Sequence, residues 1–197
     1  MFKLVDWKKG RRDYVHGPDI YNGLDTALKE CFGPNSFVTK IALRTMAHGN
    51  VFATFGDQTA GNQSKRIGVF SYVNEGSILS GILYDVDCGG SENRIPYDED
   101  SMQYSLDLKR RSISCSRQVN STAEDIVSLV KAFNLASFPV KGERWIVSQF
   151  EFNSPLPERY SEITVKLVKN FNDKFTVSSV IVDEVELGSV RFARVEL

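Results

Sequence analysis

One order of segments occurs twice in this chain of 197 residues: a helical segment followed by four strand-like runs. In residues 18–33 the apolar positions recur at spacings of three and four, which predicts one buried face of a helix. These positions are Ile20, Leu24, Ala27, Leu28 and Cys31. The strand-like runs that follow are 36–45, 50–56, 66–73 and 77–86. Alternation in the first run predicts a shared face for Phe37, Thr39, Ile41 and Leu43.

The same order returns about a hundred residues later. Residues 121–139 are predicted to be helical, and Ser121 with Glu124 forms an S-x-x-E capping box at their start. The strand-like runs after this helix are 144–155, 161–170, 174–182 and 185–197. The copies align with one gap, and the aligned pairs are Asp19 over Asp125, Val69 over Val177, Ser71 over Ser179 and Ser80 over Ser189. Identity is low, so duplication and chance similarity between two helix-plus-meander modules are both open interpretations.

Each half offers one helix to cover one face of an antiparallel sheet. We therefore predict an α+β fold in which each of two sheets curves around a single helix. The predicted boundaries are 1–90 for the first module, 91–104 for a linker and 105–197 for the second module. Pairing the two sheets edge to edge as a pseudo-dimer would hide two sheet edges. The linker lies within a polar, acidic and glycine-rich stretch.

Composition removes several classes of function. The formal net charge of -1 argues against binding nucleic acid mainly through phosphate contacts, and the basic run 109–111 is typical of a solvated surface. The three cysteines lack a CxxC pair and the chain has two histidines, which argues against a disulfide scaffold and a metal site. No signal peptide and no run of eighteen apolar residues is found, so we expect a cytoplasmic protein that does not enter a membrane.

The most specific motif lies at residues 16–28, "HGPDIYNGLDTAL". Here His16-Gly17 is followed, nine residues after His16, by Asp25-Thr26-Ala27. This motif resembles that of the PaaI-like branch of the hot-dog acyl-CoA thioesterases, and the tandem arrangement is similar to the double hot-dog thioesterases. The resemblance implies a double hot-dog fold that processes the thioester of an acyl-CoA or acyl carrier protein in fatty acid or polyketide metabolism. It implies no cofactor, and it is compatible with a homo-oligomer of double hot-dogs.

The same resemblance implies roles for individual residues. The N–H of Gly17 would polarise the thioester carbonyl, Asp25 would be the general base or nucleophile, and His16 would lie near the pocket mouth. The acyl chain would lie along the first helix, in a slot between the modules. The residues expected to line this slot are Ile20, Tyr21, Leu24 and Phe152.

Two departures from the family motif and one ordinary interpretation of Asp25 keep other interpretations open. Pro18, which has no N–H, stands where the family has a second glycine. The second copy lacks the His-Gly pair. Asp25 could also form an ordinary i,i+4 ion pair with Lys29. The alternatives are therefore a β-hydroxyacyl dehydratase, in which His16 would act with an acid such as Glu151 or Glu158, and a non-catalytic acyl-binding or assembly module.

Two further residues have ordinary structural interpretations. His48 is expected in a hairpin turn, because the sequence Ala-His-Gly-Asn suits a turn backbone. Cys31 is expected to be a small core residue on the apolar face of the first helix.

Overall fold

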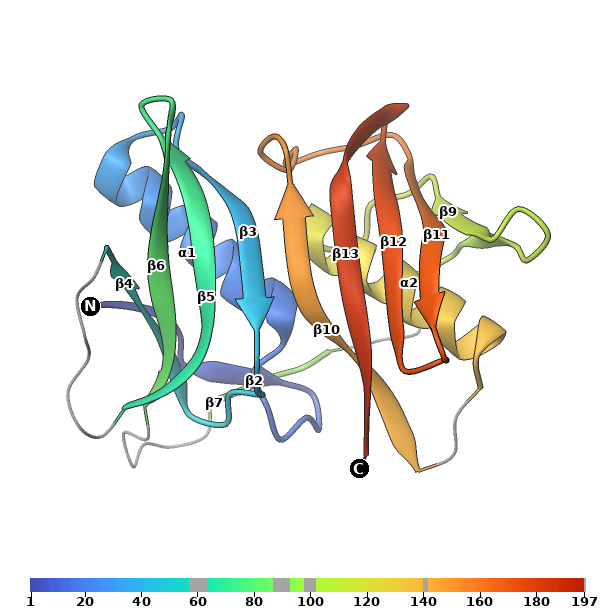
Figure 1. Cartoon of the computed structure of the whole chain (residues 1–197), viewed down its shortest axis with the longest axis horizontal. Coiled ribbons are helices and arrows are strands. Elements are labelled where there is room, and N and C mark those ends of the chain that lie inside the picture. The colour runs from blue at the N-terminus through green and yellow to red at the C-terminus, as the bar shows by residue number, and fades with distance from the viewer. Residues whose placement is uncertain (57–63, 87–92, 98–101, 140–141, 197) are drawn as a thin grey trace. The chain divides into compact units, whose positions relative to one another are not determined.

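The chain divides into two compact units, Met1–Asp98 and Glu99–Leu197. The computed structural model describes residues 1–56, 64–86, 93–97, 102–139 and 142–196 (Figure 1). Each unit has one long helix and a set of neighbouring antiparallel strands. Both helices are 16 residues long, and no described helix is long and apolar enough to cross a membrane.

Unit 1 places helix α1 (Gly17–Phe32) against one face of a five-stranded antiparallel sheet. The strands in spatial order are β1 (Phe2–Val5), β4 (Asn50–Phe55), β6 (Ser77–Val86), β5 (Ser64–Asn74) and β3 (Phe37–Leu43). A short strand before the helix, β2 (Trp7–Lys9), pairs in parallel with β7 (Asn93–Ile95). Part of the predicted linker therefore forms a strand of unit 1. The charged start of the chain gave no alternating pattern from which β2 could be predicted.

Unit 2 places helix α2 (Thr122–Ser137) against one face of a six-stranded antiparallel sheet. The strands in spatial order are β10 (Glu143–Phe152), β13 (Val185–Glu196), β12 (Phe175–Val182), β11 (Ile163–Phe171), β9 (Ser112–Cys115) and β8 (Ser105–Asp107). The two helices and the eight strands that the sequence predicted are all present, with ends shifted by a few residues. The predicted α+β class is confirmed, and in each unit one helix packs against the antiparallel strands.

The apolar face of α1 is buried as predicted, except at its end. Ile20, Leu24 and Leu28 are at most 2% exposed, whereas Cys31 is exposed, so its prediction as a core residue is wrong. The last turn of α1 contacts β5 through Phe32 instead. The Phe32 ring stacks on that of Tyr72, with the centroids 5.5 Å apart.

A β-bulge changes which residues of β3 face the core. The register of β3 against β5 shifts between Val38 and Lys40, so one extra residue interrupts the alternation. Val38 and Ile41 are buried as a result, three residues apart, while Phe37 is only partly buried. The predicted single face of Phe37, Thr39, Ile41 and Leu43 is therefore wrong.

The two copies share a hairpin but place it differently. Ser71 faces Ser80 across β5 and β6, and Ser179 faces Ser189 across β12 and β13, as the alignment of the copies requires. In unit 2 the strands β11, β12 and β13 are neighbours in chain order, which is a meander. In unit 1 the order is β4, β6, β5, so the hairpin is inserted the other way round (Figure 1). The meander prediction holds for unit 2 alone.

Candidate functional site at the start of helix α1

Helix α1 begins at a buried glycine, Gly17. His16 is the N-cap residue, Gly17 the first helical residue and Pro18 the second. The N–H groups of Asp19 and Ile20 donate to the carbonyl of His16, at 3.0 and 3.3 Å. Pro18 has no N–H. Within the described part of the chain, no acceptor is recorded for the N–H of Gly17, which lies at the positive end of the helix dipole.

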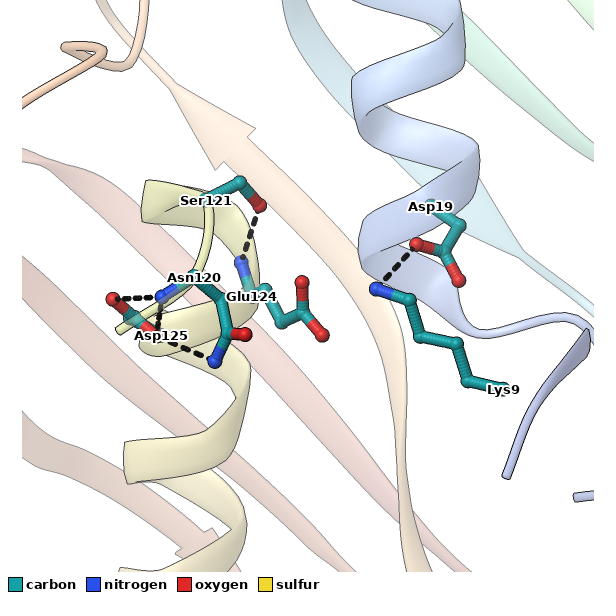
Figure 2. A network of polar contacts seen from close by, with 6 residues as sticks. All are labelled: Lys9, Asp19, Asn120, Ser121, Glu124 and Asp125. Atoms are coloured by element: carbon teal, nitrogen blue, oxygen red, sulfur yellow. Dashed lines mark hydrogen bonds and ion pairs between the residues drawn. The ribbon is translucent and has the colours of Figure 1, made fainter. Parts of the chain in front are cut away.

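The first turn of α1 is surrounded by polar and cationic side chains of unit 1. Lys9 on β2 forms an ion pair with Asp19, with Nζ 2.9 Å from Oδ1 (Figure 2). Both side chains are largely buried, at 13% and 5% exposure. The Tyr97 ring centroid lies 4.6 Å from the Arg12 guanidinium carbon, 5.3 Å from Lys9 Nζ and 6.0 Å from the centroid of the His16 ring. His16 itself is 6% exposed.

Sequence reasoning missed Lys9 and Tyr97 at this site. Lys9 is the last residue of β2, and Tyr97 follows β7. The hydrophobic pattern predicted neither strand. The parallel pairing of β2 with β7 brings Tyr97 to the start of α1, and Arg94 donates to the carbonyls of Gly10 and Arg12 at 3.2 and 3.0 Å. One sequence signal could have indicated this site. It is the acidic residue in the first helical turn, Asp19, together with the Lys- and Arg-rich stretch that precedes the helix.

Asp25 does not share a site with Gly17 inside unit 1. Eight residues along an α-helix correspond to a rise of about 12 Å, whereas a reacting carbonyl must lie within about 3 Å of both its donor and its attacking group. The Asp25 carboxylate pairs with Lys29 at 2.8 Å and is 21% exposed. Its Oδ1 is buried with no hydrogen-bond partner among the described residues. The i,i+4 pair is therefore present, and the catalytic role of Asp25 stays a prediction.

The residues predicted to line an acyl slot are core residues. Ile20, Tyr21 and Leu24 are at most 2% exposed in unit 1. Phe152 is 2% exposed in unit 2, and its ring centroid lies 6.2 Å from that of Phe150. The slot itself stays a prediction.

The start of α2 in unit 2 is organised around a buried carboxylate. Asp125 is 0% exposed and accepts hydrogen bonds from the backbone N–H groups of Val119 and Asn120 and from the Asn120 amide, at 3.1–3.2 Å (Figure 2). Asp125 also accepts a hydrogen bond from the Tyr160 hydroxyl at 2.7 Å. The Tyr160 hydroxyl oxygen in turn lies 3.5 Å from Cys115 Sγ. Burial, followed by the neighbouring carboxylate of Asp125, raises the pKa of Tyr160 far above its ordinary value. This carboxylate fixes the loop before α2.

The serine of the predicted capping box caps α2 as expected. Ser121 Oγ accepts from the backbone N–H of Glu124 at 3.4 Å (Figure 2). Glu124 is 5% exposed, so Glu124 and Asp125 are the buried helical acids of unit 2. Glu158 is exposed and Glu151 is half-exposed on the sheet face away from α2, so the two acids suggested for a dehydratase are not buried catalytic candidates.

The second histidine has local contacts in the loop between β3 and β4. His48 is exposed, with Nδ1 2.9 Å from the carbonyl oxygen of Asp13. The N–H groups of His48 and Gly49 donate to the Asp85 carboxylate at 2.9 and 2.8 Å. Among the described residues, no group of three or more His, Cys, Asp or Glu side chains is arranged to hold a metal ion.

No family model and no curated protein matches the chain. Several solved structures are similar to it in fold. The dehydratase domain of PpsC from Mycobacterium tuberculosis in complex with C12:1-CoA has 11% identity and a TM-score of 0.49 over 92% of this chain and 85% of that one. The tesB protein MAP1729c of Mycobacterium avium subs paratuberculosis has 10% identity and a TM-score of 0.44 over 97% and 90%. The 12:0-ACP thioesterase from Umbellularia californica has 10% identity and a TM-score of 0.43 over 100% and 96%. At these values no residue role transfers to this chain.

Proposed function

We propose that this protein binds an acyl thioester of CoA or of an acyl carrier protein and hydrolyses it, with the thioester carbonyl held at the start of α1. The observation that carries the proposal is the Gly17 N–H, which lies at the first position of α1 beside the buried His16. A hydrogen-bond donor at the positive end of a helix stabilises the negative charge that develops on the carbonyl oxygen.

In this proposal His16 is the group next to that carbonyl. In hydrolysis, water adds to the carbonyl carbon, the carbon–sulfur bond breaks, and a carboxylic acid and a thiol leave. An imidazole can accept the proton of the attacking water and return it to the thiolate. For a carbonyl held at Gly17, Asp25 of the same helix lies two turns away, so His16 is the residue that we propose for proton transfer.

The test is thiol release from a panel of acyl-CoAs and acyl-carrier thioesters. The variant His16→Ala should lower the rate by about 10²- to 10⁴-fold, the usual size of a general acid–base contribution. His48→Ala is the matched control, because His48 is the second of the two histidines and lies exposed in a loop. Equal loss in both variants, or thiol release independent of His16, would contradict the proposal.

β-Hydroxyacyl dehydration is the second candidate, and the buried imidazole of His16 favours it. Dehydration needs a base for the α-proton and an acid for the departing hydroxyl. His16 would be the base. Loss of water elimination from a 3-hydroxyacyl thioester in His16→Ala, without thiol release in the wild type, would support this candidate instead.

A non-catalytic acyl-binding module is the third interpretation, and the Asp25–Lys29 ion pair favours it. Acyl-CoA binding with neither thiol release nor water elimination would support it.

We further propose that the chain is a tandem hot-dog produced by duplication. The facing serine pairs of the two hairpins support this, while the exchanged hairpin order marks a later change in one copy.

A further inference from the structure

A groove of about 440 Å³ lies on the face of the unit 2 sheet opposite α2. Thr176 and Ser178 of β12 are fully buried toward α2, so the alternate residues Val177 and Ser179 point to the opposite face. The groove is lined by these two residues together with side chains of β10, β11 and β13. It is separate from the start of α1, so its test is independent of the proposed thioester chemistry.

The strand register arranges the lining by charge. At one level, Val177 faces Lys169 on β11 and Arg191 on β13. One level further, Ser179 faces Ser189 on β13 and Lys166 on β11, and Ser189 faces Glu151 on β10. One level further again, Ile181 faces Glu186. The groove therefore has basic side chains at one end, two serines with Glu151 beside them at its middle, and the acidic side chain of Glu186 at the other end.

The floor is polar and sheltered. Ser179 is 8% exposed, and its hydroxyl has no recorded hydrogen-bond partner among the described residues. Gly188 also lines the groove, and a Cβ there would be 2.1 Å from the carbonyl oxygen of Glu151. Small residues at these positions keep the floor low between longer neighbours.

The charged ends are available to a ligand. Within the described residues, neither Lys169 nor Glu186 has a recorded ion pair. Arg191 forms an ion pair with Glu151 at 4.0 Å, and Glu151 also accepts a hydrogen bond from the Gln149 amide at 2.6 Å. Phe171, which is 52% exposed, adds an apolar surface at the basic end.

We propose that this groove binds a short peptide with free termini, its carboxylate at Lys169 and its ammonium at Glu186. The two Cα atoms are four strand residues and two strand spacings apart, which corresponds to about 16 Å at ~3.3 Å per residue and ~4.8 Å per strand. The two side chains take up part of that span, which leaves room for two or three extended residues at about 3.5 Å each. Ser179 and Ser189 would contact the peptide backbone, and Phe171 would contact an apolar side chain.

Calorimetric titration of the full chain with the tripeptide Ala-Ala-Phe tests the proposal. Lys169→Met and Glu186→Gln should each weaken binding at least fivefold, and Ser179→Ala about threefold. Acetylating the amine and amidating the carboxylate of the peptide should remove binding. Lys65→Met is the control, because Lys65 is an exposed strand lysine of unit 1, whereas the groove belongs to unit 2. Ser71→Ala in unit 1 is the control for Ser179.

Three outcomes would overturn the proposal. The first is no heat of binding with the wild type, and the second is equal binding of the capped tripeptide. The third is loss of affinity in Lys65→Met that matches the loss in Lys169→Met. Far-UV circular dichroism and the urea midpoint of each variant separate a lost contact from a lost fold.

Discussion

At the scale of single residues, burial and immediate partners decide what the candidate groups can do. Asp19 and Asp125 are aligned in the sequence, and both are at most 5% exposed. Asp19 pairs with the Lys9 ammonium, whereas Asp125 accepts backbone, amide and hydroxyl donors. The same residue type at matching positions therefore holds a neighbouring strand in one unit and a loop in the other.

Asp25→Asn should change the free energy of unfolding by about 0.5 kcal/mol or less, because an exposed i,i+4 ion pair contributes little. Urea denaturation of the variant and of Lys29→Met, which breaks the same pair from the other side, measures this. If the stability effect is small, a large loss of turnover in Asp25→Asn would assign Asp25 a role in the reaction. A loss of several kcal/mol in Asp25→Asn alone would instead assign Asp25 a structural role.

Gly188→Ala should destabilise the protein by about 1–3 kcal/mol through overpacking. An added Cβ would lie 2.1 Å from the Glu151 carbonyl oxygen and 2.9 Å from the Phe152 Cα, both backbone atoms that cannot move aside easily. Gly76→Ala is the control, since Gly76 also has a positive φ but nothing lies within 4 Å of the new atom. The urea midpoint should fall further for Gly188→Ala; equal midpoints would refute the steric explanation.

At the scale of secondary-structure elements, the two helices begin in different ways. His16 makes no side-chain capping bond to α1, and Pro18 with its fixed φ suits the first turn of the helix. Ser121 caps α2 through the N–H of Glu124. A helix start without a side-chain cap leaves N–H groups for other acceptors, which is the property that the proposed function uses.

Ser121→Ala should therefore cost about 0.5–2 kcal/mol of stability, the usual effect of removing an N-cap hydroxyl. Ser121→Asn keeps a capping oxygen and should restore most of the loss. Thermal unfolding of the two variants in parallel checks the prediction. If Asn and Ala destabilise equally, the Ser121 hydroxyl does not act as a cap.

At the scale of the whole molecule, buried ionisable groups set how stability depends on pH. The pKa of Tyr160 is raised by burial and then by its bond to Asp125, and burial also raises the pKa values of Tyr72 and Cys115. A group whose folded pKa exceeds its unfolded value contributes stability below the unfolded pKa, and that contribution is lost as the pH rises above it.

The free energy of unfolding should therefore fall as the pH rises above the ordinary tyrosine pKa of about 10. Tyr160→Phe should reduce that slope, and Tyr72 and Cys115 account for part of what remains. Urea denaturation between neutral and alkaline pH measures the slope. Tyr104→Phe, at a position 51% exposed, is the control and should leave the slope unchanged. An unchanged slope in Tyr160→Phe would contradict the assignment.

The sequence alone determined the elements whose patterns are local. Helix periodicity gave α1 and α2, alternation gave the eight longer strands, and the S-x-x-E pair gave the cap of α2, because each depends on neighbours a few residues apart. Sequence could not give the short strands β1, β2, β7, β8 and β9, which offer too few residues to show a period. It also missed the bulge in β3, since a single inserted residue reverses the faces of all that follow.

Only the tertiary structure decided which chemical groups lie together. The pairing of β2 with β7 brings Lys9 and Tyr97 to the start of α1, and the helical rise separates Gly17 from Asp25 although the motif contains both. The groove on unit 2 depends on register across four strands, of which β10 and β13 pair although β11 and β12 lie between them in the chain. Local spacing fixes which face of an element a residue occupies, whereas the partners across that face come from pairings between distant segments that no local pattern encodes.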